Sequence, residues 1–350
     1  EVQAALAAAS AGADVLRYEP SPRGLPEARR AVVGYYAARG TLVDPEHLVL
    51  TASTSEAYAF LFKLLCDPGD RVLVPQPSYP LFDFLAALDG VCLEPYPLGW
   101  DGAFHLDFAA LQQALDAAGD RARAILLVSP NNPTGTFLKQ DERERLAEIA
   151  AARGLALVAD EVFADYAFAP DPRRAPTLAG ETGALAFALS GFSKIAGLPQ
   201  LKLAWIAVAG PPALRDAALA RLDLVADTYL SVGTPVQLAA PALLALAPTI
   251  AAAIAHRTRE NLAALQQTVR DTACQVLPVE GGWYAVVRVP AVRTDEAWAE
   301  ALLAGDGVLV QPGYFYDFPR EAHLVLSLLP VPAIFREGVH RLVARVAAIA

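Results

Sequence analysis

The segment RAILLVSPNNPTG (123–135) joins a continuous apolar run to a turn that starts directly after it. Five more apolar runs occur in the first two-thirds of the chain, with helical stretches between them: HLVLT (47–51), RVLVP (71–75), LALVAD (155–160), ALAFALS (184–190) and LAWIAVA (203–209). Continuous apolar strands with connections of roughly 10–25 residues are typical of a sheet that is buried on both faces. The pattern therefore predicts an α/β fold with a doubly wound, mostly parallel sheet.

The pattern changes after about Val236, where the sequence becomes mainly helical up to residue 270. Beyond that point we expect short strands and two helices, the strands at 275–277, 283–289, 307–310 and 323–329 and the helices at 294–304 and 332–349. This alternation indicates a smaller α+β C-terminal domain. We therefore expect three parts, which are an N-terminal segment (1–30) forming a partly truncated arm, a large α/β domain (31–236) and the small domain (237–350).

The composition argues against several classes of protein. The formal net charge is -10 and no cluster of Lys and Arg is present, which argues against nucleic acid as a partner. Residues 231–255 carry no charged side chain, but Pro235, Pro241 and Pro248 interrupt them, so we expect a buried helix pair and no membrane span. The cysteines are scattered and the histidines form no cluster with ligand spacing, which predicts no disulfide framework, no metal site and a cytoplasmic protein.

Two motifs place small polar side chains where a predicted strand ends. TASTSEA (51–57) opens a helix with three hydroxyl residues, Ser53, Thr54 and Ser55. Hydroxyl groups and free backbone N–H groups at a helix start bind phosphate, although the same residues would also make an ordinary helix cap with Glu56. SPNNPTG (129–135) ends its strand in an Asn-Pro turn, and taken alone it indicates only a turn.

Two further motifs place ionisable side chains at strand ends. VADEVF (158–163) puts two carboxylates after apolar residues. An unpaired charge is costly to bury there, so we expect a cationic partner, which a structural ion pair would also supply. SGFSKIAGLPQLK (190–202) puts Lys194 directly after an apolar strand. This lysine is either a surface residue at a helix start or an amine whose pKa is lowered for Schiff-base chemistry.

The order and spacing of the four motifs resemble one family, the pyridoxal-phosphate-dependent aminotransferases of fold type I, class I/II. The resemblance runs from LRYEPSPRGLPEAR (16–29) to LVLSLL (324–329). It implies that the large domain binds pyridoxal 5'-phosphate and that Lys194 carries this cofactor as a Schiff base. It also implies that Asp160 pairs with the protonated pyridine nitrogen and that Asn132 donates to the ring 3-oxygen.

The resemblance assigns the other cofactor contacts to side chains along the chain. Tyr79, in PSYP (77–80), would stack on the ring face. The cofactor phosphate would be held by side chains from two helix starts and a loop, namely Ser53, Thr54, Ser55, Ser193 and Lys202. Tyr18 and Thr234 would reach the phosphate of the neighbouring subunit, which implies a homodimer with composite active sites.

Three positions depart from the commonest family pattern. Phe163 stands beside the ring where the family usually has a tyrosine that donates to the 3-oxygen. Lys202 stands where the family often has arginine, so the phosphate loses a bidentate partner. Val325 stands where the family has the arginine that binds the substrate carboxylate. The cofactor contacts are therefore ordinary, whereas the substrate contacts are not.

Two arginines are candidate replacements for the missing carboxylate ligand, Arg23 after Tyr18 and Arg288 after GGWYAVV (281–287). Either one could equally be a surface residue. An aromatic substrate pocket is implied by resemblance, formed by Tyr314, Phe315 and Tyr316, although these rings could also belong to the core.

The leading hypothesis is a transaminase that moves an amino group between a small amino donor and a 2-oxo acid in a ping-pong reaction. The absence of arginine at Val325 keeps a second hypothesis open, a β-eliminating lyase or a decarboxylase with the same fold and cofactor. A third hypothesis is a pyridoxal-phosphate-binding regulatory domain, although the chain contains no basic DNA-binding region.

Overall fold

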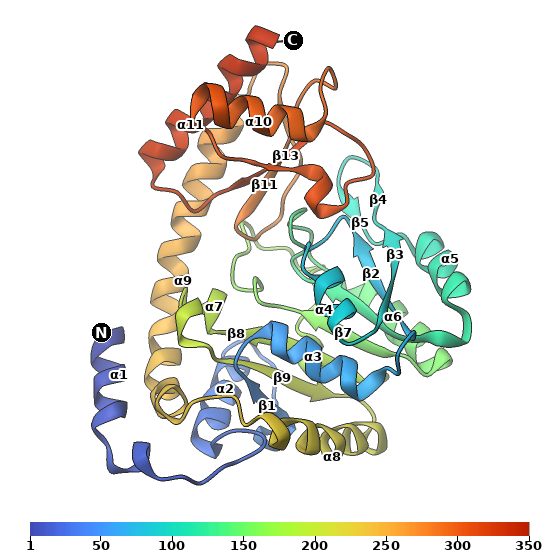
Figure 1. Ribbon diagram of the computed structural model, residues 1–350, viewed down its shortest axis with the longest axis vertical. Helices are drawn as coiled ribbons and strands as arrows, with labels where there is room; N and C mark the ends of the chain where they lie inside the picture. Colours follow the sequence, from blue (N-terminus) through green and yellow to red (C-terminus); the bar gives the residue numbers. More distant parts are fainter. Residues whose placement is uncertain (350) are drawn as a thin grey trace.

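The computed structural model describes residues 1–349, which form a large α/β domain and a smaller α+β domain above it (Figure 1). The large domain is built on a seven-stranded sheet in the order β1-β9-β8-β7-β6-β2-β3. The strands are β1 (Leu48–Thr51), β2 (Arg71–Gln76), β3 (Cys92–Pro97), β6 (Ala122–Val128), β7 (Ala156–Asp160), β8 (Ala186–Gly191) and β9 (Ala204–Ala209).

The sheet is mostly parallel, as the sequence predicts. Strands β3, β2, β6, β7 and β8 run parallel, whereas β9 is antiparallel to both of its neighbours. All six predicted strands of this domain are present within two residues of their expected bounds. Edge strand β3 was not expected, because its residues are mostly half-exposed and lack a continuous apolar run.

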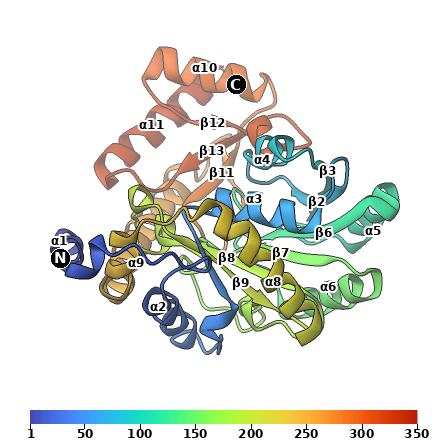
Figure 2. The same ribbon diagram turned by 60° about the horizontal axis from the view of Figure 1, so that its bottom comes forward.

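Helices cover both faces of the sheet, which explains the continuous apolar runs (Figure 2). One face carries α2 (Pro26–Ala37), α5 (Phe108–Ala118), α6 (Gln140–Arg153) and part of α9 (Thr234–Thr268). The other carries α3 (Thr54–Leu65), α4 (Phe82–Leu88) and α8 (Pro212–Tyr229).

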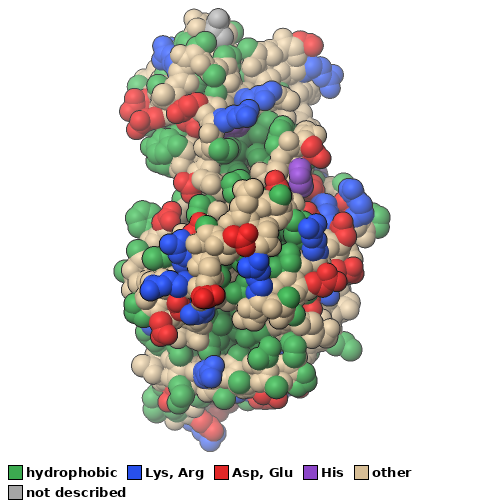
Figure 3. Space-filling view, turned by 90° about the vertical axis from the view of Figure 1, so that its right-hand side faces the viewer, with side chains coloured by type: hydrophobic (Ala, Val, Ile, Leu, Met, Phe, Trp, Pro, Cys, Tyr) green, Lys and Arg blue, Asp and Glu red, His purple; other side chains and the backbone are tan. Residues whose placement is uncertain are grey.

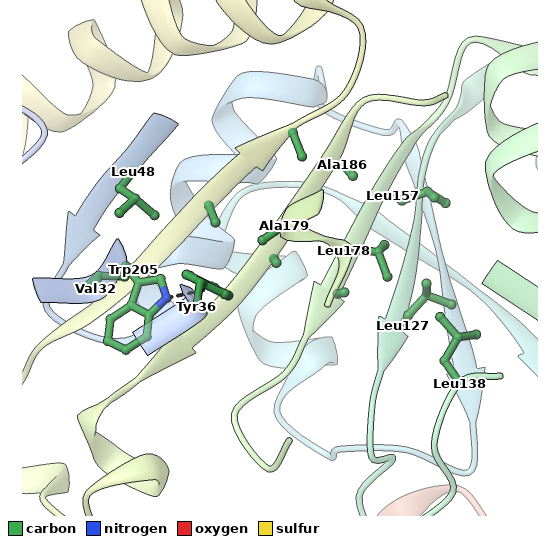
Figure 4. Packing of buried hydrophobic residues seen from close by; sticks show 14 of the residues in the cluster. Val32, Tyr36, Leu48, Leu127, Leu138, Leu157, Leu178, Ala179, Ala186 and Trp205 are labelled. Carbon is green, nitrogen blue, oxygen red and sulfur yellow. Dashed lines mark hydrogen bonds between the residues drawn. The ribbon is translucent and has the colours of Figure 1, made fainter. Parts of the chain in front are cut away.

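The largest buried ring of the first face belongs to Trp205 on β9, whose Nε1 donates to the hydroxyl of Tyr36 at 3.0 Å (Figure 4). Both side chains are almost fully buried, so this hydrogen bond satisfies the polar atoms of two large rings inside the core. It joins α2 to the sheet and fixes the helix that follows the N-terminal segment.

The small domain has an antiparallel four-stranded sheet in the order β10-β11-β13-β12. Its strands are β10 (Gln275–Val276), β11 (Tyr284–Arg288), β12 (Gln311–Pro312) and β13 (His323–Ser327), and its helices are α10 (Asp295–Asp306) and α11 (Pro332–Ile349). The strand predicted at 307–310 is wrong. Val310 there packs in the small-domain core without a partner strand, and pairing begins only at Gln311.

The expected helix pair near residues 231–255 is also wrong, since the single 35-residue helix α9 continues through Pro241 and Pro248. By length and hydropathy alone α9 could cross a membrane, but it contributes buried residues to both domains. Leu243 packs in the large core and Leu265 in the small one, so α9 runs through both (Figure 1). The domain boundary predicted at residue 236 lies in the first turn of this helix.

The N-terminal segment contains α1 (Val2–Ala11), which packs against α9 (Figure 1). A polypeptide hairpin of β4 (Gly99–Trp100) and β5 (Phe104–His105) extends from the large domain. Acidic and basic side chains are interspersed on the face seen in Figure 3, which shows no extended basic stripe there.

Candidate active site

The predicted site residues lie where strands of the large sheet end at their carboxyl side, facing the small domain. Asp160 closes β7 and Lys194 lies in α7 (Phe192–Ile195), which follows β8. Asn132 follows β6, and Tyr79 follows β2. These four strands are neighbours in the sheet, so the topology brings together side chains that are far apart in sequence.

Asp160 is a buried carboxylate held by two donors. Its Oδ2 accepts a hydrogen bond from the hydroxyl of Tyr58 at 3.0 Å, and its Oδ1 accepts one from the backbone N–H of Val162 at 3.1 Å. Burial raises the pKa of Asp160, while the two donors and the charge of Lys194 lower it. Lys194 is the cationic side chain whose charge acts on Asp160, although the two form no ion pair among residues 1–349.

Glu161 follows Asp160 but points to the other face of the sheet, because successive strand residues alternate. Its carboxylate accepts from the Thr177 hydroxyl and from the Leu178 backbone N–H. Burial is the main cause that raises the pKa of Glu161 to about 7. Neutral donors hold this carboxylate, while the nearby Arg143 pairs with Glu181. Glu161 is thus a structural group and Asp160 is the one that faces the site.

Lys194 is half-buried and its amine lies between aromatic rings. Its Nζ is 5.2 Å from the ring centre of Trp283 and 5.7 Å from that of Phe163. Burial lowers the pKa of the Lys194 amine, and the charge of Asp160 opposes that change. The backbone carbonyl of Lys194 accepts a hydrogen bond from the hydroxyl of Tyr166, and this bond helps to fix the short helix α7. Burial thus makes the neutral, nucleophilic form of this amine easier to reach than in an exposed lysine.

The start of α3 shows the helix cap that the sequence left as an alternative to phosphate binding. Ser53 Oγ accepts from the backbone N–H of Glu56 at 3.1 Å, and Glu56 accepts from the backbone N–H of Ala52. Thr54 and Ser55 are half-buried in the first turn. The cap uses Ser53 as an acceptor only, so its own hydroxyl proton is still available to an anion.

A buried polar atom without a partner marks the same place. Asn132 is 6% exposed and its Oδ1 has no hydrogen-bond partner among residues 1–349. Because the two ends of an amide are assigned from the hydrogen-bond network, either end can face a bound group. An unsatisfied buried atom of this kind costs about 1–3 kcal/mol, which a ligand would recover. A carboxylate, an amide, a lysine and a helix start fit the polar atoms of pyridoxal phosphate.

The wall opposite these groups is aromatic. Tyr284 on β11 meets Phe163 edge-on, with ring centres 6.2 Å apart, and Trp283 meets Phe163 at 5.3 Å. Tyr316 is buried in the same small-domain cluster as Val325, and half-buried Tyr284 packs against that cluster. We call Trp283, Tyr284, Tyr316 and Val325 the aromatic wall. We call Asp160, Asn132, Lys194 and Tyr58 the polar floor.

Tyr58, Trp283 and Tyr284 were not predicted as site residues. Tyr58 lies four residues after Thr54 and therefore on the same side of α3, a helical spacing that could have indicated it. Trp283 and Tyr284 belong to the apolar run before Arg288, and the contacts that place them cross between domains. No local pattern reveals such contacts.

Three predicted cofactor residues lie at the periphery. Lys202 is exposed, in a left-handed backbone conformation with φ 54°, and forms no ion pair within the described part of the chain. Tyr18 is 85% exposed, and Thr234 lies at the first turn of α9. Tyr18 and Thr234 line one surface hollow together with Ser231, whose hydroxyl donates to Glu56 at the start of α3. Half-buried Ser193, in contrast, is next to Lys194.

Neither candidate for the missing carboxylate ligand lies ready to bind one. Arg23 makes a two-pronged ion pair with Asp223 on α8, so its fork is already occupied. Arg288 is exposed and bonds to Gln275. It lies four residues along β11 from Tyr284, a distance of roughly 13 Å. Both guanidinium groups are therefore engaged by other side chains, which agrees with the alternative that they are surface residues.

Val325 is buried on β13 opposite Val286 of β11. Its surroundings are apolar, with Leu277 and Phe318 in the same cluster. Of the aromatic run predicted to line the substrate pocket, only Tyr316 is buried there, whereas Tyr314 and Phe315 are 46% and 47% exposed. The strand position that the resemblance assigns to an arginine is thus part of a hydrophobic wall.

Comparison with known proteins agrees with this arrangement. Residues 1–329 match the family model described as aminotransferase class I and II. The chain belongs to this family. The aminotransferase is 30% identical over 328 residues to the LL-diaminopimelate aminotransferase of Desulforudis audaxviator, a match that covers 92% of this chain and 81% of the relative. It is 28% identical over 308 residues to the valine–pyruvate aminotransferase of Mycobacterium tuberculosis, covering 86% and 76% of the two chains.

A solved structure with the same fold is the alanine aminotransferase from Pyrococcus furiosus, with a TM-score of 0.89 at 23% identity. The superposition covers 99% of the aminotransferase described here and 88% of that chain. Fold type I and transferase activity of the aminotransferase type are therefore shown, and this family implies pyridoxal phosphate as the cofactor.

Proposed function

We propose that this aminotransferase uses pyridoxal 5'-phosphate carried by Lys194 and transfers the amino group of an apolar amino acid to a 2-oxo acid. The observation that carries the proposal is the meeting of the Lys194 amine, the buried Asp160 carboxylate and the unpaired Asn132 amide at adjacent strand ends. When bound, pyridoxal phosphate supplies an electron sink that stabilises negative charge at the substrate α-carbon.

The residues of the chain would divide the remaining work between them. Asp160, as a fixed anion, holds a positive charge at the end of the slot that faces Tyr58. Lys194, whose pKa burial lowers, can accept a proton from a substrate carbon and return it to another position. Trp283 and Phe163 exclude water from the Lys194 amine by covering it with rings.

The aromatic wall supports an apolar donor. Val325 and Tyr316 offer hydrophobic surface, and the strand position expected to carry a guanidinium has no charge. The relatives do not decide the donor, because one is named for diaminopimelate and another for valine. We propose that contact with these rings contributes most of the discrimination between donors, at about 0.8 kcal/mol per buried methylene.

We further propose a homodimer located in the cytoplasm. Exposed Tyr18 and neighbouring Thr234 would complete the site of the partner, as the resemblance implies. The three cysteines are all free, which suits a reducing compartment. Sedimentation analysis of the purified protein tests the dimer. Tyr18→Phe should weaken cofactor retention and leave the dimer intact.

Half-reactions test the activity. The cofactor-loaded protein is mixed with single amino acids, and bleaching of the visible absorbance is followed together with 2-oxo acid release. We expect leucine and phenylalanine to react faster than aspartate and lysine. Lys194→Ala should lose both signals, whereas Lys63→Ala, a lysine paired with Asp89, should retain them. No bleaching with any donor would overturn the proposal.

The same experiment separates the lyase alternative, which the apolar position at Val325 keeps open. Release of ammonia or sulfide together with pyruvate, without bleaching, identifies β-elimination. Release of carbon dioxide with formation of an amine identifies decarboxylation. Either result in place of 2-oxo acid formation would replace transamination as the main reaction.

A further inference from the structure

Tyr58 lies outside every motif that carries the site, yet its hydroxyl bonds directly to Asp160. The tyrosine is 1% exposed and comes from the second turn of α3. The distance from its hydroxyl to Asp160 Oδ2 is 3.0 Å. We propose that Tyr58 is a positioning residue that holds the Asp160 carboxylate in its working orientation and keeps it ionised. This inference rests on the proposed cofactor.

The packing around Tyr58 separates its ring from its hydroxyl. The ring lies edge-on to Phe82 at 5.3 Å and tilted to Phe62 at 6.1 Å, so a phenylalanine at this position would keep both contacts. The hydroxyl has Asp160 as its hydrogen-bond partner, in a region without solvent. Hydrogen bonds to a carboxylate are about twice as strong as neutral ones. Removal of the hydroxyl therefore acts on Asp160 more than on the core.

The direction of the effect follows from the charges. Burial favours the protonated form of Asp160 and raises its pKa, while the Tyr58 hydroxyl favours the anion and lowers it. The remaining donor in the protein is the N–H of Val162 on Oδ1. Without Tyr58 the Oδ2 atom is free to turn or to take a proton. An uncharged carboxyl is a weaker partner for a cationic ring nitrogen.

The position of Tyr58 on α3 gives it a second link to the site. Thr54 and Tyr58 are separated by four residues, so both project from the same side of the helix. The helix start meets the phosphate end of the proposed slot, and the next turn meets the Asp160 end. One rigid element therefore sets the distance between the two ends.

Tyr96 provides a matched control. It is also 1% exposed, and its hydroxyl donates to the backbone carbonyl of Leu126 at 2.7 Å. Tyr96→Phe therefore deletes a buried tyrosine hydroxyl and its hydrogen bond without touching Asp160. The two variants should lose similar thermal stability, so any difference in cofactor behaviour belongs to Asp160.

Two measurements test the proposal. Titration of the apoprotein with pyridoxal phosphate should show a dissociation constant about tenfold higher for Tyr58→Phe and changed by less than about twofold for Tyr96→Phe. Infrared spectroscopy of the apoprotein labelled at aspartate, with Asp160→Asn to assign the band, should show Asp160 titrating at higher pH in Tyr58→Phe. This second readout does not need bound cofactor.

A double-mutant cycle shows whether Tyr58 acts through Asp160. In the Asp160→Asn background, Tyr58→Phe should change cofactor affinity by less than about twofold, since its target is gone. If Tyr58→Phe keeps wild-type affinity and the wild-type Asp160 titration, Tyr58 is only a core residue and the inference is wrong. If wild-type protein itself does not bind pyridoxal phosphate, the proposed function fails first. The two failures are thus distinguished.

Discussion

The ring of Phe163 lies beside both the Lys194 amine of the polar floor and Tyr284 of the aromatic wall, but these two groups of residues are built on different principles. In the floor, the Tyr58 hydroxyl is bonded to Asp160, whereas Oδ1 of Asn132 has no hydrogen-bond partner among residues 1–349. The wall contains no charged side chain, and Val325 and Tyr316 are buried within it. The polar groups of the floor can thus be explained as hydrogen-bond and charge partners for a cofactor. We propose that the wall selects the substrate, and the two relatives are named for different amino acids.

The largest effect is expected from the floor. Asp160→Asn keeps the shape but removes the charge, so kcat/KM for amino-group transfer should fall by about 10²- to 10³-fold. The neighbouring variant Glu161→Gln is the control, because its side chain points to the other face and bonds to Thr177. Stopped-flow half-reactions measure both. Equal activity of Asp160→Asn and wild type would break the distinction between floor and wall.

The next effect concerns the wall. Val325→Arg restores the residue that the family pattern has there, but it places a charge in an apolar cluster, where Val325 is 2% exposed. We expect the free energy of unfolding to fall by about 3–5 kcal/mol. Val325→Leu tests size without charge and should cost about 1–3 kcal/mol. Denaturant titration with urea compares them.

If Val325→Arg is as stable as wild type, the wall has room and solvent for a guanidinium. In that case the hydrophobic character assigned to the surroundings of Val325 would be wrong. Improved use of acidic donors by the same variant would lead to the same conclusion.

A third effect separates the two adjacent carboxylates by pH. The pKa of Glu161 is raised by burial from 4.5 to about 7, so the folded protein holds a proton that the unfolded chain releases. Its contribution to stability is full below pH 4.5 and is lost as the pH rises to about 7. One pKa unit corresponds to about 1.4 kcal/mol, so the loss is about 3 kcal/mol at most. Urea titrations of wild type and Glu161→Gln between pH 4.5 and 7.5 measure it.

The difference in the free energy of unfolding between wild type and Glu161→Gln should change between pH 4.5 and about 7 and should be constant above that pH. A difference that does not depend on pH would mean that Glu161 is ionised in the folded protein. The pH dependence of activity should follow the ionisation of Asp160 and Lys194 and should not show the Glu161 transition.

The smallest expected effect concerns Phe163, which lies beside both the polar floor and the aromatic wall. Phe163→Tyr adds a hydroxyl beside the Lys194 amine, where the ring centre is 5.7 Å from Nζ. One new hydrogen bond is worth about 0.5–1.5 kcal/mol, so cofactor affinity should rise by less than about tenfold. Equilibrium dialysis of pyridoxal phosphate measures the change. Weaker binding would show that the space beside Phe163 is too small for the hydroxyl.

The sequence predicted the floor better than the wall. Asp160, Lys194 and Asn132 lie at the ends of continuous apolar strands, and parallel strands end at one edge, so the topology brings them together, whereas their cofactor roles were implied by the resemblance. Tyr58 was missed because a tyrosine among apolar helix residues looks like core, which its ring indeed is. The wall depends on contacts between Phe163 and Tyr284, more than a hundred residues apart, which no local pattern encodes.

The errors in secondary structure have physical causes. The apolar residues at 307–310 resemble a strand, but only Val310 is buried in the small-domain core, Leu309 is 79% exposed, and pairing begins at Gln311. The two prolines in α9 indicated a break, yet each removes only one backbone hydrogen bond, and packing on both domains holds the helix together. Arg23 and Arg288 were candidates because of their positions after Tyr18 and after GGWYAVV (281–287), and the sequence does not reveal that Asp223 and Gln275 hold them.

The long helix α9 has a mechanical consequence. Ala247 is anchored in the large core and Leu262 in the small one, with Pro248 just beyond the first anchor. Because proline removes one backbone hydrogen bond of the helix there, bending α9 at Pro248 would cost less free energy than bending an unbroken helix. Over the roughly 21 Å from Pro248 to Leu262, a bend of about 5° moves the far end by about 2 Å. A displacement of this size would change the 5.2 Å distance between the Trp283 ring, which packs against α9, and the Lys194 amine.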